Sequence, residues 1–210
     1  MNRRDFIIKS LKLSGALLLG RAIAPALFSD VLKNPIPTEK TIPKIHNILF
    51  SSNLPIVENH FDFTWLKPRQ TTQKIVLHHS AIADTDSINA DDIHHMHLDN
   101  GWSGIGYHLY IHKSGLIETG RPIEDIGAHT YKNNNNSIGI CLAGNFEEEL
   151  PTDSQMTSTI QLLSVLCQMY SLSPNESTLL AHRDLNETAC PGENVYQKLP
   201  YLRESIGNII

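Results

Sequence analysis

The stretch Lys74-Ile75-Val76-Leu77-His78 is a continuous aliphatic run with the length of a β-strand, and it marks the start of the globular part of the chain. The run ends in the histidine pair His78 and His79. At the end of a strand, a side chain can leave the edge of the core and face a cleft. We therefore predict a first strand that brings two histidines to the mouth of a cleft.

Short strands and helices are expected to alternate after this first strand. A helix from about Asn89 to Asp99 should end at the stop signal Asn100-Gly101. Residues 106–112 alternate in polarity, and the turn at 113–115 should fold them against 116–119 as a hairpin. Two further short strands are expected, at 137–142 and 179–181.

Two helices are expected nearer the C-terminus. Residues Thr152 to Gln155 form a capping-box pattern that opens a long helix. The apolar face of this helix should consist of residues spaced four and three apart, namely Met156, Ile160, Leu163, Cys167 and Tyr170. A closing helix is expected from Val195 to Arg203. The predicted fold class is α/β, with one mixed central β-sheet flanked by helices.

Composition limits the classes of partner. The 210 residues suit one domain with an N-terminal extension, and 17 basic and 22 acidic residues give a net charge of -5. Residues 1–26 hold five of the basic residues and one of the acidic ones, so the rest of the chain carries a net charge of -9. An acidic body repels phosphate backbones, so we expect no nucleic-acid partner. No stable protein partner is implied.

Residues 1–26 resemble a twin-arginine signal peptide. Arg3 and Arg4 stand just ahead of an aromatic residue, and the apolar stretch Leu11–Leu19 that follows is short for a membrane span. Ala24-Pro25-Ala26 offers small residues for cleavage. The alternative is an ordinary basic amphipathic N-terminus. The signal predicts passage through the twin-arginine translocase to the periplasm or the extracellular space, with a membrane tether if it stays uncleaved.

Residues 27–70 are predicted to form a Pro-rich linker or an N-terminal wrap around a domain at 71–210. Prolines exclude long helices from this segment. They are Pro35, Pro37, Pro43, Pro55 and Pro68. Phe61, Phe63 and Trp65 are expected to anchor the end of the segment against the core.

Three cysteines are too few for a disulfide scaffold in a domain of this size. Cys141 and Cys167 could pair, although two buried free thiols are the favoured interpretation. The third, Cys190, lies eight residues after His182.

One histidine of the pair at the first strand, together with His182 and Cys190, makes a candidate three-ligand zinc site with one position left for water. An open position suits catalysis, because zinc-bound water becomes a nucleophile near neutral pH. The spacing of these residues fits neither a CxxC pair nor an HExxH helix. Spacing alone therefore leaves the metal site undecided.

Five blocks of sequence favour the metal site. They are Ile75-Val76-Leu77-His78-His79-Ser80-Ala81, Gly101-Trp102-Ser103-Gly104-Ile105-Gly106-Tyr107-His108, Gly127-Ala128-His129-Thr130, Asn136-Ser137-Ile138-Gly139-Ile140, and Ala181-His182-Arg183 with Ala189-Cys190-Pro191-Gly192. In this order the blocks resemble the zinc-dependent N-acetylmuramoyl-L-alanine amidase superfamily, which joins phage-type lysozyme-amidases with the peptidoglycan recognition proteins. The resemblance covers residues 74–192, more than half of the chain.

The resemblance implies that Zn²⁺ is held by His78, rather than His79, with His182 and Cys190. It also implies a catalytic role for Tyr107, whose phenol can hydrogen-bond zinc-bound water or a developing oxyanion. Thr188 matches a position that carries lysine or threonine in the family, and its hydroxyl could donate to the substrate carbonyl. The alternatives are a core-edge tyrosine and a loop-capping threonine.

Other positions match the family with less direct consequences. His129 matches a substrate-contacting histidine, and the alternative is a histidine that supports a metal ligand or has a structural role. Asn134 and Asn136 match a loop pair that is expected to order a turn.

Residues of the first helix and the loop after it give further expectations. His97 should pack beside Trp102, while His94 and His95 should be solvated. Gly104 departs from the family, in which an aspartate is usual, and this change puts the local turn geometry in doubt.

The implied reaction is hydrolysis of the amide bond between N-acetylmuramic acid and L-alanine in peptidoglycan by a zinc-bound water. The implied partner is therefore a peptidoglycan muropeptide. The alternative is a non-catalytic peptidoglycan-binding module, because many recognition proteins keep the groove but lack a zinc ligand. The export signal argues against an amidase that recycles wall fragments in the cytoplasm.

Overall fold

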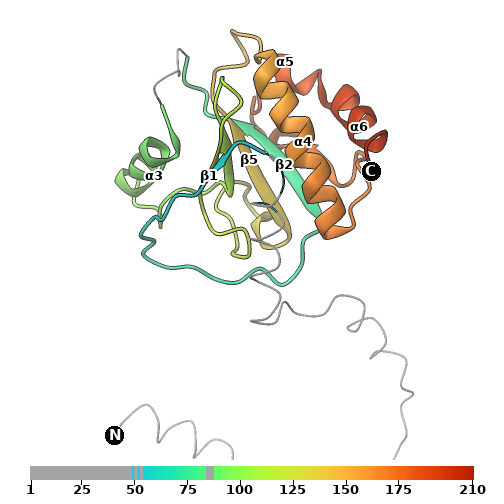
Figure 1. Ribbon diagram of the computed structural model, residues 1–210. Coiled ribbons are helices and arrows are strands. Elements are labelled where there is room, and N and C mark those ends of the chain that lie inside the picture. The colour runs from blue at the N-terminus through green and yellow to red at the C-terminus, as the bar shows by residue number, and fades with distance from the viewer. Residues whose placement is uncertain (1–48, 50–51, 53, 84–87) are drawn as a thin grey trace, which may run out of the picture. The chain divides into compact units, whose positions relative to one another are not determined.

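The computed structural model describes residues 49, 52, 54–83 and 88–210 (Figure 1). The proposed signal peptide at 1–26 and residues 27–48 of the segment that follows it lie outside these residues. Among the described residues, no helix combines the length and the apolar character that crossing a bilayer requires.

The described chain forms one mixed sheet of six strands in the order β1-β4-β3-β5-β2-β6. The strands are β1 (Ile56–Val57), β2 (Lys74–His79), β3 (Leu109–Ile111), β4 (Ile117–Thr119), β5 (Ser137–Leu142) and β6 (Leu179–Ala181). β3 and β4 pair antiparallel as the predicted hairpin, and all other neighbours pair in parallel. The predicted α/β class with a mixed central sheet is confirmed, although β3 is shorter than the expected strand at 106–112.

β2 lies inside the sheet because its aliphatic run has no polar face. Its strand neighbours are β5 and β6, and Ile75, Val76 and Leu77 are fully buried. Such two-sided burial is typical of parallel strands covered by helices on both faces. The strand ends in His78, which the register places beside Cys141 of β5.

Helices cover both faces of the sheet, with α4 and α6 on one side and α3 on the other (Figure 1). α4 (Asp153–Tyr170) and α6 (Leu199–Gly207) pack their leucines on one core cluster with Ile75 and Leu77. α3 (Ala90–Asp99) packs Ile93 on a second cluster that contains Cys141. Since His78 neighbours Cys141 in register, its side chain lies on the α3 side of the sheet.

The capping box predicted for α4 is present, and the predicted apolar face of α4 packs on the core. Asn89 caps α3, and the capping box of Thr152 with Gln155 opens α4. The buried face of α4 includes Gln155 and Thr159, whereas Met156 is only partly buried. The Gln155 amide is buried because it donates to the carbonyl oxygens of Ile111 and Ala143 in the sheet.

The closing helix is broken in two, so the single helix predicted from Val195 to Arg203 is wrong. The chain forms α5 (Glu193–Tyr196) and then α6. The cause is Pro200, which has no amide hydrogen for the carbonyl of Tyr196 and whose ring would clash with that carbonyl in a continuous helix. In the first turn of a new helix the missing donor costs nothing.

The chain ahead of β2 lies along the sheet and the α3 side. β1 adds a strand at the edge, and Phe61 and Phe63 pack on the second core cluster as expected. Trp65, by contrast, is 60% exposed, so its predicted anchoring role is wrong. His94 is only 3% exposed and stacks on Phe61 at 4.5 Å between ring centroids, so the expectation that it is solvated is also wrong.

Gly104 explains how His94 can be buried. The residue has φ of +117°, and a Cβ there would lie 2.5 Å from Cε1 of His94. The usual family aspartate could not occupy this place beside the two rings of His94 and Phe63. Glycine at position 104 therefore leaves room for the rings of His94 and Phe63 to pack beside the backbone.

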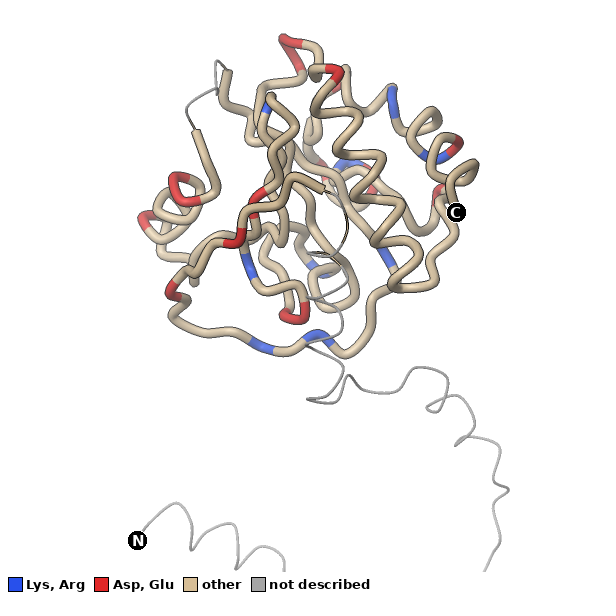
Figure 2. Tube along the Cα trace, viewed as in Figure 1, with Lys and Arg blue, Asp and Glu red and all other residues tan. Residues whose placement is uncertain are grey.

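Charged side chains are spread over the domain. Figure 2 shows Lys and Arg at separate places along the described chain. Several are paired, such as Lys113 with Glu149 at 2.7 Å.

Candidate metal centre

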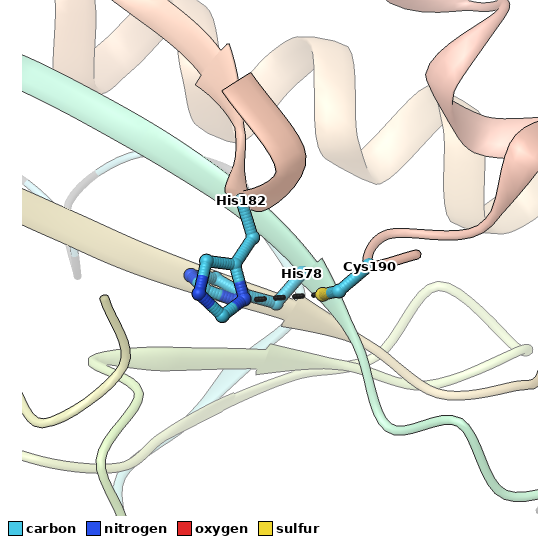
Figure 3. A group of neighbouring side chains, drawn as sticks. All are labelled: His78, His182 and Cys190. Carbon is cyan, nitrogen blue, oxygen red and sulfur yellow. Dashed lines mark hydrogen bonds between the residues drawn. The ribbon is translucent and has the colours of Figure 1, made fainter. Parts of the chain in front are cut away.

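Three donor residues meet at one end of the sheet. The candidate ligand atoms of His78, His182 and Cys190 all lie within 4.8 Å of one another. Figure 3 shows the two imidazoles and the thiol side by side, approaching from β2, from the turn after β6 and from the following loop. His78 is 1% exposed, and the other two residues are partly exposed.

Strand register explains the meeting of the two histidines. β2 pairs in parallel with β6, with Leu77 opposite Ala181. His78 and His182 each follow one member of this pair, and their ring centroids are 4.6 Å apart. The structure therefore brings His78 to the cluster, while Nδ1 of His79 lies 3.3 Å from the amide nitrogen of Phe146 and accepts its hydrogen bond.

The loop from Arg183 to Cys190 closes back on itself and returns the thiol to the histidines. The Arg183 amide donates to the Cys190 carbonyl at 2.9 Å. The Cys190 amide in turn donates to Oγ1 of Thr188 at 3.2 Å. Sγ of Cys190 then lies 3.5 Å from Nδ1 of His78.

The electrostatics of the cluster suit a bound cation. Burial lowers the pKa of His78 well below its usual value, with a further contribution from nearby His129. Burial also lowers the pKa of His182, an effect that a hydrogen bond with Asn186 partly offsets. Both imidazoles are therefore neutral at pH 7 and offer lone pairs. Burial raises the pKa of Cys190 to about 12, so the thiolate needs a nearby positive charge.

Tyr107 lies against the same cluster. Its ring centroid is 5.1 Å from that of His78, and the side chain is partly buried. Burial, with Cys141 and Cys190 nearby, raises the pKa of Tyr107 well above its usual value. The phenol therefore keeps its proton and can act as a hydrogen-bond donor.

Thr188 is exposed and caps the loop through the bond that its Oγ1 accepts from Cys190. This hydrogen bond agrees with the alternative of a loop-capping threonine. The hydroxyl hydrogen is not used in that bond, and a catalytic role for Thr188 stays a prediction.

His129 lies beneath the cluster. It is 8% exposed, and its Nδ1 is 2.9 Å from Nε2 of His78. Burial, with His182 nearby, lowers the pKa of His129 to about 3. The observed contact is with a candidate ligand, while contact with substrate stays a prediction. Asn134 orders the turn as expected, since its Oδ1 accepts the backbone amides of His129 and Thr130, both at 2.8 Å.

The remaining sequence predictions have clear places. His97 packs beside Trp102 with 4.6 Å between ring centroids, as expected, and His95 is exposed. Cys141 and Cys167 are both buried free thiols, which confirms the favoured interpretation.

Arg183 is a residue that the sequence analysis missed. Its guanidinium donates to the Ala189 carbonyl and pairs with Glu147 at 3.0 Å and Glu193 at 2.7 Å. It also lies over the ring of Tyr196. These contacts hold the loop that precedes Cys190. The only signal in the sequence is that Arg183 directly follows a candidate ligand.

Known proteins resemble this chain over the same region. A family model described as N-acetylmuramoyl-L-alanine amidase matches residues 68–193. The endolysin of Enterobacteria phage T3 is 36% identical over 130 residues, which is 60% of this chain and 83% of the endolysin. Peptidoglycan-recognition protein LB of Drosophila melanogaster is 32% identical over 132 residues, 60% of this chain and 56% of that protein.

Solved structures agree with these similarities. N-acetylmuramoyl-L-alanine amidase LysC from Clostridium intestinale is 36% identical and superposes with a TM-score of 0.64, over 70% of this chain and 95% of LysC. The matched family region contains β2, the Tyr107 segment, β6 and Cys190. The chain therefore belongs to the N-acetylmuramoyl-L-alanine amidase family.

Proposed function

We propose that this protein is an exported zinc amidase that hydrolyses the amide bond between N-acetylmuramic acid and L-alanine in peptidoglycan. The main supporting observation is the convergence of His78, His182 and Cys190, whose donor atoms lie within 4.8 Å of one another. Similarity to a phage endolysin and to the LysC amidase supports the same reaction.

The donor set fits zinc. Neutral imidazole and thiolate are its usual protein ligands, and three of them leave a position for substrate or water, as in catalytic sites. Among the described residues, this group contains no fourth histidine, cysteine or carboxylate, so a closed structural site is disfavoured. A zinc ion held here would supply Lewis-acid activation of the scissile carbonyl and of water.

The residues around the three donors have separate roles in the proposed reaction. Tyr107 holds its proton and donates a hydrogen bond toward negative charge that develops on the substrate oxygen. The Thr188 hydroxyl, exposed at the edge of the site, donates its free hydrogen to the same oxygen. The rings of His78 and Tyr107 lie 5.1 Å apart, so the phenol is carried next to a candidate ligand.

The complete donor set favours an enzyme over a recognition module. A binding groove needs no cluster of two imidazoles and one thiol, and burying such polar groups without a partner is costly. Peptidoglycan is the substrate in the enzyme and the ligand in the module, so binding alone does not separate the two. Release of a new amine does.

For the N-terminal part, we propose that residues 1–26 are a twin-arginine signal, 27–70 a linker or wrap, and 71–210 the amidase domain. The paired Arg3 and Arg4 ahead of an apolar stretch support this division. The enzyme would then act in the periplasm or outside the cell.

The test is metal analysis combined with digestion of purified peptidoglycan. Wild type should contain about one zinc per chain and release L-alanine amino termini. Cys190→Ser should lose both properties while keeping the fold. Cys167→Ser is the matched control, since this thiol is free, is buried in the first core cluster and is not among the three candidate ligands. Zinc retained at full stoichiometry by Cys190→Ser would show that the ligand set is wrong. Binding of peptidoglycan without amine release would favour the recognition module.

A further inference from the structure

The two ring nitrogens of His78 have different neighbours. Nδ1 lies 3.5 Å from Sγ of Cys190, and Nε2 lies 2.9 Å from Nδ1 of His129. A metal shared by His78 and Cys190 must bind the nitrogen that faces the thiol. The hydrogen of a neutral His78 then sits on Nε2, and His129 is placed to accept it.

The groups around His129 favour one direction of hydrogen bonding. The Ser137 hydroxyl donates to the Asn133 carbonyl at 2.6 Å, so its oxygen can accept from Nε2 of His129 at 3.5 Å. With its hydrogen on Nε2, His129 presents a lone pair on Nδ1. The Thr130 hydroxyl lies 2.9 Å from this Nδ1 and 3.4 Å from Nε2 of His78, so it can donate to the first and accept from the second, and it then shares the one lone pair of Nδ1 with Nε2–H of His78. Each bond therefore agrees with a hydrogen on Nε2 of His78.

The fold reserves space for the His129 ring. A Cβ at Gly139 would lie 2.4 Å from Cγ of His129, and a Cβ at Gly127 would lie 2.4 Å from its Cδ2. At both glycines a side chain would collide with the imidazole, and Oδ1 of Asn134 accepts the backbone amide of His129. This close fit favours the orientation in which Nδ1 of His129 faces His78.

We propose that His129 is a positioning residue for the metal site, which accepts the Nε2 hydrogen of His78 and so keeps Nδ1 of His78 free to bind zinc. This inference rests on the zinc site proposed above. The outer partner of a metal-bound histidine is commonly a carboxylate, a backbone carbonyl or water. Here it is a neutral imidazole, and its effect should appear in zinc affinity before any substrate is added.

Two substitutions separate this role from simple packing. His129→Leu removes the acceptor while keeping an apolar side chain in the space. His129→Asn restores an acceptor, because its amide oxygen stands at the same number of bonds from Cβ as Nδ1. His94→Leu is the matched control, since His94 is also buried and accepts a backbone hydrogen bond, from Ile105, outside the metal cluster.

Zinc affinity is measured by competition with a chromophoric chelator on the purified full chain, with circular dichroism to verify folding. Loss of an outer partner typically costs about 10–100-fold in metal affinity. We expect that loss in His129→Leu, recovery to within a few-fold in His129→Asn, and wild-type affinity in His94→Leu.

Three outcomes would overturn the inference. Wild-type affinity in folded His129→Leu would remove the positioning role, and a raised KM in the same variant would assign His129 to substrate contact instead. Equal losses in the leucine and asparagine variants would show that packing alone matters. If wild type itself binds no zinc, the proposed metal site fails first, which is a distinguishable result.

Discussion

Replacing Tyr107 by phenylalanine removes one hydroxyl from the site and leaves the ring in place. The ring lies 5.1 Å from that of His78 and 5.6 Å from that of His97, and these contacts do not need the oxygen. The hydroxyl lies toward the thiol of Cys141, which is a weak hydrogen-bond partner. The free energy of unfolding should therefore change by about 1 kcal/mol or less.

The expected effect on catalysis is much larger. The raised pKa of Tyr107 means that a proton is available for donation throughout the neutral range. In a buried site, loss of one donor to a developing oxyanion costs about 10²–10³ in kcat, or about 2.7–4 kcal/mol. Because the charge appears only in the transition state, KM should change little.

The assay measures amine release from purified peptidoglycan over a range of substrate concentrations with zinc present. Tyr110→Phe is the matched control, because its hydroxyl bonds to the Ile88 carbonyl on the same side of the sheet but lies outside the metal cluster. That variant should keep kcat. Full kcat in folded Tyr107→Phe, or a loss confined to KM, would refute the proposed role of the phenol.

Three further predictions concern the loop, the turn and the signal. Arg183→Ala should release the loop before Cys190 and weaken zinc binding about 10-fold or more, as measured by chelator competition. Unchanged zinc affinity would contradict the role of Arg183 in holding this loop. Gly104→Ala should destabilise the domain by about 1–3 kcal/mol more than Gly101→Ala in urea unfolding, because a Cβ at 101 meets open space; equal losses would show that backbone strain alone matters. Changing Arg3 and Arg4 to lysine should leave the precursor in the cytoplasm on fractionation, and normal export would indicate the general secretory route.

Elements with a dense local pattern could be predicted from the sequence, and those set by distant contacts could not. The aliphatic run of β2 and the capping box at Thr152 are local signals, and both are confirmed. The buried Gln155 could not be foreseen, because its amide is satisfied by carbonyls 12 and 44 residues away. Pro200 did contain a local signal, and the break between α5 and α6 could have been read from it.

The candidate site divides in the same way. His78, His182 and Cys190 could be selected through resemblance to a family, while their spacing alone left the site undecided. The contact of His129 with His78 depends on the pairing of β2 with β5 and on space left by Gly139, neither of which a linear pattern displays. The contacts by which Arg183 holds the loop likewise include Glu147, which lies 36 residues away in the sequence.

The separation of the donors along the chain also links metal binding to folding. His78 and Cys190 are 112 residues apart, and their approach depends on the register between β2 and β6. In an unfolded chain these donors do not form a common site, so the proposed zinc would bind the native state in preference and would stabilise it. At a free zinc concentration 1,000 times the dissociation constant, this linkage is worth about 4 kcal/mol. Such a domain would be most stable if it bound its metal in the same compartment in which it folds. The proposed twin-arginine route accepts folded cargo, so it would allow zinc to be bound before export.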